Sequence, residues 1–124
     1  MPNSTKNIMG AGVPPLTAQQ ISGTLSDGLI ATGNSQATAL ALQANANVVT
    51  TTAASTGVLL PAGTSPGDEV MVANLGASSL AVYPSTGGTI GTGAANASFA
   101  VGAGKTGYFI ARADGVSWIA ILSA

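Results

Sequence analysis

The stretch VGAGKTG, residues 101–107, contains residues that could bind a phosphate. Its GKT triplet ends nucleotide-binding P-loops, in which backbone N–H groups and a lysine hold the phosphates. A P-loop also needs a glycine five residues earlier, where this chain has Phe99, and a helix directly after the threonine. Residues 107–112 are instead rich in aromatic and β-branched types, which favour a strand. We therefore predict a turn between two strands, with Lys105 pointing into water.

The four acidic residues do not form a pattern suited to acid–base chemistry. Asp68 and Glu69 are adjacent, so on a strand they point to opposite faces and cannot readily share a proton or a metal. Asp27 and Asp114 each precede a glycine, which is typical of turns. The chain has no histidine and no cysteine, which removes the usual nucleophile–base pairs and metal ligands. We expect no enzyme activity, no catalytic or cofactor-binding residue, no cofactor and no metal.

Charge is scarce along the whole chain. Charged residues make up 6% of the sequence, against about 25% in an ordinary soluble protein, and the formal net charge is −1. Such a chain has no basic face for nucleic acid or for an anionic membrane, and no run long enough for a membrane span or a signal peptide. A surface of Ser, Thr, Asn, Gly and Ala keeps apart from its neighbours poorly. It suits a protein that is covered by partners or by copies of itself.

The sequence changes character near residue 45. All five aromatic residues lie beyond it, whereas residues 1–45 have scattered Gly, Pro and Ser and little to bury. Pro14 and Pro15 favour an extended backbone, and Thr17 could cap one short helical turn. For SQATALALQAN, residues 35–45, both helix and strand are compatible, and we favour an extended segment. The sequence thus predicts an extended N-terminal arm, residues 1–45, before a body at residues 46–124.

The body shows short apolar runs about every ten residues, separated by turn signals. This spacing predicts an all-β body, a compact antiparallel β-sandwich or a jelly-roll-like fold. The runs are 47–52, 58–60, 69–74, 80–83, 98–101, 108–113 and 117–122, with a weaker one at 89–90.

Alternation within the runs indicates which side chains face the core. Val70 and Val72 share one face and Met71 the other. The last run is apolar on both of its faces, although one face of an antiparallel sheet is normally wet. We therefore expect intersubunit burial, and the candidate oligomer or core residues of the strand faces are Tyr108, Ile110, Trp118, Ile119 and Ile121.

Residues 56–122 carry a series of turns and core positions: Leu-Pro-Ala at 60–62, Pro-Gly-Asp at 66–68, Val-Tyr-Pro at 82–84, Ala-Gly-Lys at 103–105 and a tryptophan near the end. Through these positions the region resembles a module of small structural proteins of tailed bacteriophages. The arm matches more loosely, through Pro-Pro-Leu and Ala-Thr-Gly. The resemblance implies a head decoration or cement protein, or a head fibre, commonly trimeric.

Together these features predict a capsid decoration protein of the virion, made in the host cytoplasm. We expect a homotrimer that binds the major capsid protein, without nucleic acid, membrane or small-molecule substrate. The arm residues expected to contact the capsid are Pro14, Pro15, Leu16, Ile21, Leu25 and Leu29. The alternative is a trimeric fibre or receptor-binding module that recognises a host surface glycan.

Overall fold

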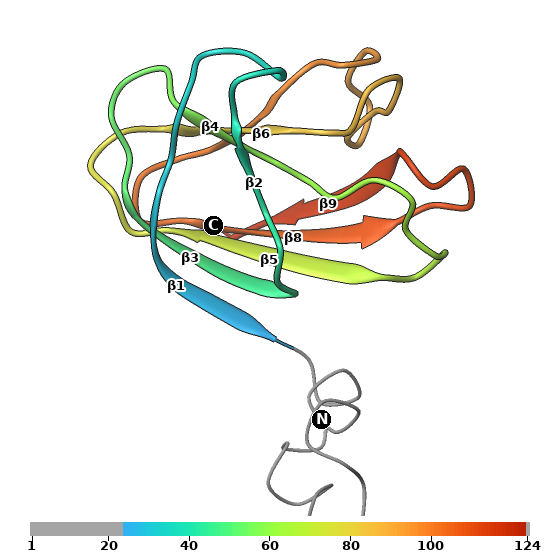
Figure 1. Ribbon diagram of the computed structural model, residues 1–124, viewed down its shortest axis with the longest axis horizontal. Coiled ribbons are helices and arrows are strands. Elements are labelled where there is room, and N and C mark those ends of the chain that lie inside the picture. Colours follow the sequence, from blue (N-terminus) through green and yellow to red (C-terminus); the bar gives the residue numbers. More distant parts are fainter. Residues whose placement is uncertain (1–23, 124) are drawn as a thin grey trace, which may run out of the picture.

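The strands form two sheets that face each other, and the first six strands of the chain enter the two sheets alternately (Figure 1). The computed structural model describes residues 24–123, and within them there is no helix, including none that could span a membrane. The strands are β1 (Leu25–Ile30), β2 (Leu40–Ala41), β3 (Ala46–Thr51), β4 (Gly57–Leu59), β5 (Glu69–Asn74), β6 (Leu80–Tyr83), β7 (Phe99–Val101), β8 (Thr106–Ala111) and β9 (Trp118–Leu122). The predicted all-β class is confirmed.

The expected antiparallel pairing is wrong for the pairs that the first six strands make among themselves. The five-stranded sheet has the order β1-β3-β5-β8-β9, and the four-stranded sheet has the order β2-β4-β6-β7. Strands β1, β3 and β5 run parallel, as do β2, β4 and β6, and only the pairs made by β7, β8 and β9 are antiparallel. Parallel neighbours need a crossover connection. Here each crossover passes through a strand of the opposite sheet, so closely spaced runs do not reveal the strand direction.

The boundary between arm and body does not lie at residue 45. Strand β1 pairs with β3 and strand β2 pairs with β4, so residues 25–30 and 40–41 belong to the two sheets. Between them, residues 35–39 form a turn rather than a continuous extended segment. The sequence did not reveal these strands because their stability comes from parallel neighbours distant in sequence. Residues 1–23 of the predicted arm lie outside the described residues.

The body strands agree closely with the apolar runs. The bounds of β5 and β6 are those predicted, and β3, β4, β7 and β9 differ by one residue at one or both ends. Strand β8 begins two residues earlier and ends two residues earlier than its run. The weak run at 89–90 contributes only an isolated bridge between Ile90 and Trp118.

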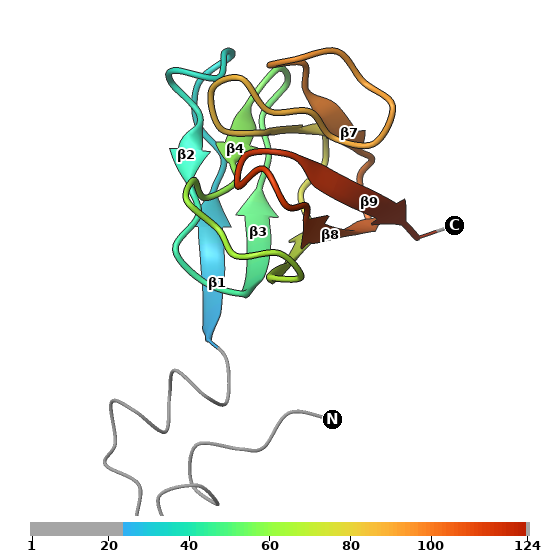
Figure 2. The same ribbon diagram turned by 90° about the vertical axis from the view of Figure 1, so that its right-hand side faces the viewer.

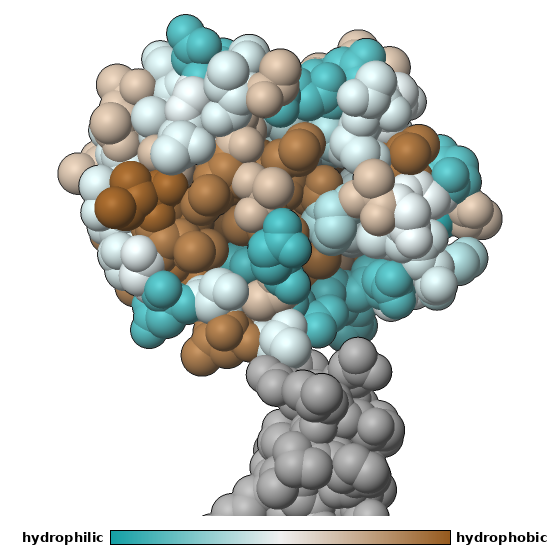
Figure 3. Space-filling view, viewed as in Figure 1, coloured by the Kyte–Doolittle hydropathy of each residue, from teal (hydrophilic) through white to brown (hydrophobic). Residues whose placement is uncertain are grey.

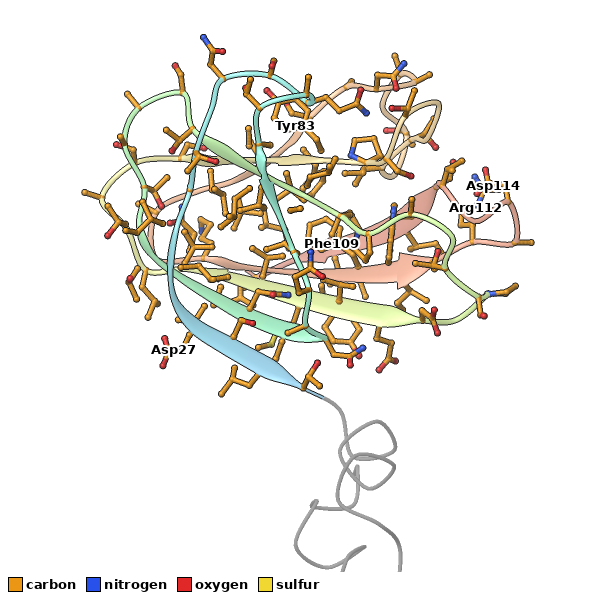
Figure 4. The ribbon with its side chains drawn as sticks, in the orientation of Figure 1. Asp27, Tyr83, Phe109, Arg112 and Asp114 are labelled. Atoms are coloured by element: carbon orange, nitrogen blue, oxygen red, sulfur yellow. The ribbon has the colours of Figure 1, made fainter. Side chains whose placement is uncertain are left out.

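One core lies between the sheets. Val70 and Val72 of β5 face Val82 of β6, and all three are buried. Phe109 lies between the two layers in Figure 4 and makes an edge-to-face contact with Phe99, with ring centroids 5.7 Å apart. Burial of these side chains holds the sheets together.

The amide of Asn74, at the end of β5, ties several segments together inside this core. Its Oδ1 accepts hydrogen bonds from Thr52 Oγ1 at 2.7 Å and from the N–H of Gly76 at 3.0 Å. Its Nδ2 donates to the carbonyl oxygens of Ser78 at 2.8 Å and Val101 at 2.9 Å. A fully buried amide with all of these bonds fixes the corner where the chain leaves one sheet for the other.

Replacing Asn74 by alanine is expected to lower the free energy of unfolding by about 3 kcal/mol, because it leaves buried donors and acceptors without partners. Chemical denaturation measures the change. The matched control is Asn45→Ala, an exposed asparagine whose Nδ2 donates to the carbonyl of Glu69 at 3.0 Å, and it should cost less than about 1 kcal/mol. Equal effects of the two substitutions would contradict the role given to Asn74.

Candidate functional site: an apolar sheet face

The five-stranded sheet carries a row of apolar side chains on the face that points away from the core. The strand registers align Leu25 with Ala46, Ala46 with Met71, Met71 with Tyr108, and Tyr108 with Ile121. Residues directly opposite in neighbouring strands point to the same side of a sheet. The row therefore crosses all five strands, over about 19 Å at the usual strand spacing.

Further side chains extend this row along the strands. Ile110 and Ile119 oppose each other on one side of it, and Val48 and Ala73 on the other. We call the set Leu25, Ala46, Val48, Met71, Ala73, Tyr108, Ile110, Ile119 and Ile121 the outer face. Among the described residues, two charged groups belong to it: Glu69, beside Ile110 at the start of β5, and Asp27, which is two residues after Leu25 on edge strand β1 and points to the same side.

The most exposed apolar side chains lie at the two edges of the sheet. Among residues 24–123 six large hydrophobic residues are exposed, and five of them belong to the edge strands: Leu25 and Ile30 on β1, and Ile119, Ile121 and Leu122 on β9. Edge strands of monomeric proteins normally carry charge or proline. Figure 3 shows a further concentration of apolar surface in the middle of the body, on the side where β1 and β2 face the viewer.

The four-stranded sheet is covered differently. Its outward side chains include Leu59 and Tyr83, which oppose each other on β4 and β6. The turn at residues 34–38 lies over them, since Tyr83 Oη donates to the carbonyl of Asn34 at 3.4 Å and Gln36 Nε2 donates to the carbonyl of Pro84 at 2.7 Å. Thus the chain's own loop covers part of this sheet.

Glu69 alters the electrostatics of one rim of the outer face. A hydrogen bond to the Glu69 carboxylate, together with partial desolvation and the carboxylate's negative charge, raises the pKa of the Tyr108 phenol above its ordinary value of 10.0. The phenol therefore stays neutral at physiological pH, beside the Glu69 carboxylate.

The structure divides the predicted strand-face residues between two environments. Trp118 is fully buried and belongs to the core. Tyr108, Ile110, Ile119 and Ile121 lie together on the outer face. Met71 and Ala46, which complete the row, were absent from the predicted set. The alternation that places Met71 opposite Val70 and Val72 was the available signal, but it did not reveal which strand lies beside β5.

The residues predicted as arm contacts have different positions. Leu25 is 65% exposed at the edge of the outer face, whereas Leu29 packs against the core of its own chain. Pro14, Pro15, Leu16 and Ile21 lie outside the described residues. These positions describe a single chain, so the capsid contacts stay a prediction.

The GKT stretch forms the predicted turn. Gly104 has a φ of +75°, the N–H of Lys105 donates to the carbonyl of Gly102 at 3.1 Å, and strand β8 begins at Thr106. No helix follows in the described chain, so the anion site of a P-loop is not assembled.

The carboxylates occupy local turns and bends. Asp68 Oδ2 accepts the N–H of Ser65 at 2.8 Å, at the start of β5. The turn predicted at Asp27 and Gly28 is wrong. These residues form a kink inside β1, where Gly28 has a φ of +69° and the strand register shifts. Figure 4 shows Asp27 far from Asp114 and Arg112 at the hairpin tip. Within residues 24–123 no group of three or more metal-ligating side chains gathers.

A cavity of about 420 Å³ opens beside the four-stranded sheet. Gln36, Leu59, Ser85, Thr86 and Val116 are among its lining residues. The Ser85 hydroxyl is buried without a hydrogen-bond partner among the described residues. The lining is uncharged and combines apolar with hydroxyl and amide groups.

The hairpin between β8 and β9 sets the position of the last strand. Gly115 has a φ of +78°, and Asp114 Oδ1 accepts the N–H groups of Val116 at 3.1 Å and Ser117 at 2.8 Å. The predicted turn at this dipeptide is confirmed. These bonds lead Trp118 into the core and leave Ile119 on the outer face.

Comparison with known proteins gives no family for this fold. No family model, no curated protein and no solved structure matches the chain.

The turn at Asp114 is expected to make the folded chain less stable at low pH. Backbone bonds from Val116, the hydroxyl and N–H of Ser117, and the charge of Arg112 lower the pKa of Asp114 below its ordinary value of 3.8. A lowered pKa in the folded chain gives stability that is complete above the unfolded value of about 4 and is lost as the pH falls through the folded value. Melting temperatures from pH 7 to pH 2 should show that Asp114→Asn, which cannot ionise, removes part of the acid-induced loss. Parallel pH profiles for the two proteins would contradict this assignment.

Proposed function

We propose that this chain is a structural protein of a bacteriophage virion, a decoration or cement protein that bridges neighbouring capsid subunits. In this proposal the functional unit is a homotrimer and its partner is the major capsid protein. The body of each chain is a sandwich-type unit, in which the first six strands pair in parallel within each sheet. The protein carries out no reaction.

The observation that carries the proposal is the outer face. A sheet with an apolar row from edge to edge, opposite a complete core on its other side, is stabilised when another chain covers it. Burial of about 25 cal/mol per Å² of apolar surface then contributes to association. In the proposed trimer, the faces of three chains cover one another around the central axis.

The low charge of the chain fits the same role. A cement protein adheres through many small contacts over a large area. Because a trimer attaches through three chains at once, weak contacts of each chain add up to a high overall affinity. A surface with few ions loses little hydration when it is covered. Residues that precede Thr24, including Pro14, Pro15, Leu16 and Ile21, are assigned in this proposal to the arm that contacts the capsid, together with Leu25.

The second candidate is a trimeric fibre or receptor-binding module for a host glycan. The cavity beside the four-stranded sheet favours it, because uncharged polar groups such as Gln36 and Thr86 suit sugar hydroxyls. Binding to a glycan array that is lost in Thr86→Val would favour this role over cementing.

Met71→Lys tests the cement proposal. Met71 lies at the centre of the row, and lysine has a similar unbranched stem, so the single chain should keep its fold while an ammonium group enters the trimer contact. We expect wild type at about three times the 11.9 kDa chain mass and Met71→Lys at the mass of a single chain, by light scattering. Phage heads stripped of the protein should bind wild type and lose most binding of the variant.

Ala100→Lys is the matched control. Ala100 is exposed on β7, at the edge of the other sheet. This variant should remain trimeric and decorate heads as wild type does. A monomeric wild type, or equal binding of all three proteins to heads, would contradict the proposal.

A further inference from the structure

Strand β9 is an edge strand without the usual protection against pairing. Its sequence, Trp118–Leu122, is WIAIL, with no charge, proline or glycine. Ile119 and Ile121 are 52% and 57% exposed. The opposite edge of the same sheet, β1, has Asp27 and a kink at Gly28, both of which discourage pairing. In Figure 2, β9 lies at the front of the body, on the outside of the sheet.

The hydrogen-bond pattern identifies which backbone groups of β9 are free. Arg112 N–H donates to the carbonyl of Ser117, and Ser123 N–H donates to the carbonyl of Thr106, so the odd-numbered residues 117–123 point their backbone groups at β8. The even-numbered residues then point away from β8, because direction alternates along a strand.

Only part of this outer edge is already used. Trp118 N–H donates to the carbonyl of Thr89 at 2.8 Å, and the carbonyl of Trp118 accepts from Gly91 N–H at 2.9 Å. Within residues 24–123, Ala120 and Leu122 have no such partners on this edge. Each chain therefore offers two N–H and two C=O groups to another strand.

We propose that β9 pairs antiparallel with β9 of a second copy of this chain, on a two-fold axis at Ile121. In this register Ala120 of each copy faces Leu122 of the other. Each of these facing pairs exchanges two N–H···O=C bonds, so all four free groups of each copy are satisfied. Centring the pair on Ala120 instead would place Leu122 against Trp118, whose edge is occupied by Thr89 and Gly91.

The side chains fit the same arrangement. The two Ile121 side chains meet on the outer face, where the sheet continues through Tyr108 and Ile110 into each body. Cross-strand contacts between such aliphatic side chains stabilise sheet pairing. A second copy matches this edge because it presents equal numbers of donors and acceptors and no charge.

This contact is two-fold, so it is distinct from the proposed trimer and goes beyond it. It would join a chain of one trimer to a chain of a neighbouring trimer. A pair of three residues on each side is short, and its occupancy rises when several copies are held close together.

A single cysteine tests the pairing, because the natural chain contains none. Two residues that face each other without hydrogen bonds have Cα atoms about 4.5 Å apart, within the range of about 4.4–6.8 Å that a disulfide requires. Purified full-length Ile121→Cys should therefore form a covalent dimer under mild oxidation, seen on a non-reducing gel. Adding Leu122→Pro, which removes one N–H on the pairing edge but none used by β8, should lower the dimer yield.

The matched control is Ile119→Cys, on the same strand and the same face with similar exposure. In the proposed register it faces Ser123, and the two copies of residue 119 lie about 13 Å apart along the strands. We expect its dimer to form at least about tenfold more slowly, because its thiols lack a fixed neighbour.

Three results would overturn the pairing. They are no dimer from Ile121→Cys, equal rates for the two variants, or a dimer that appears only when the two variants are mixed. The last result would place the axis at Ala120. None of them changes the expected mass of the wild-type trimer, so pairing and trimer are tested separately.

Discussion

One constraint governs this structure: the five-stranded sheet carries apolar side chains on both faces, and residues 24–123 cover only one of them. The inward face is sealed by the four-stranded sheet, with Trp118 and Phe109 fully buried. The outward face has the row from Leu25 to Ile121, and no described segment lies across it as the 34–38 turn lies across the other sheet. An apolar face left open in this way is the feature on which the proposed adhesion between chains rests.

The winding of the chain creates this face. Because β1, β3 and β5 alternate with β2, β4 and β6, each strand of one sheet is followed by a strand of the other, and the two sheets grow together. Strand β8 then adds antiparallel to β5, and β9 adds antiparallel to β8, which brings Tyr108 and Ile121 into line with Met71. Asn74 holds the corner at which β5 gives way to β6, so a single buried amide stabilises the register on which the row depends.

Sequence patterns predicted much of the body and little of its topology. Alternation identified Val70 and Val72 as core and marked the last strand as apolar on both sides, because side-chain direction depends only on local backbone geometry. Pairing direction and strand order depend on contacts between residues distant in sequence. The parallel pairing of the first six strands and the position of β1 in the five-stranded sheet were therefore missed. The same limit hid Met71 and Ala46, whose neighbours lie 21 or more residues away in the chain. Asp27-Gly28 was misassigned because a glycine at positive φ serves a kinked strand as well as a turn.

The two tyrosines offer the most direct measurement of the central claim. Tyr108 and Tyr83 are both half-buried, but Tyr108 lies on the outer face and Tyr83 on the opposite sheet. Hydroxyl-radical labelling of single Met71→Lys chains and of wild type in assembled particles compares the two rings within one molecule. We predict that assembly protects Tyr108 and leaves the labelling of Tyr83 much less changed. Equal labelling of Tyr108 in both states would show that no chain covers the outer face, and it would contradict the account.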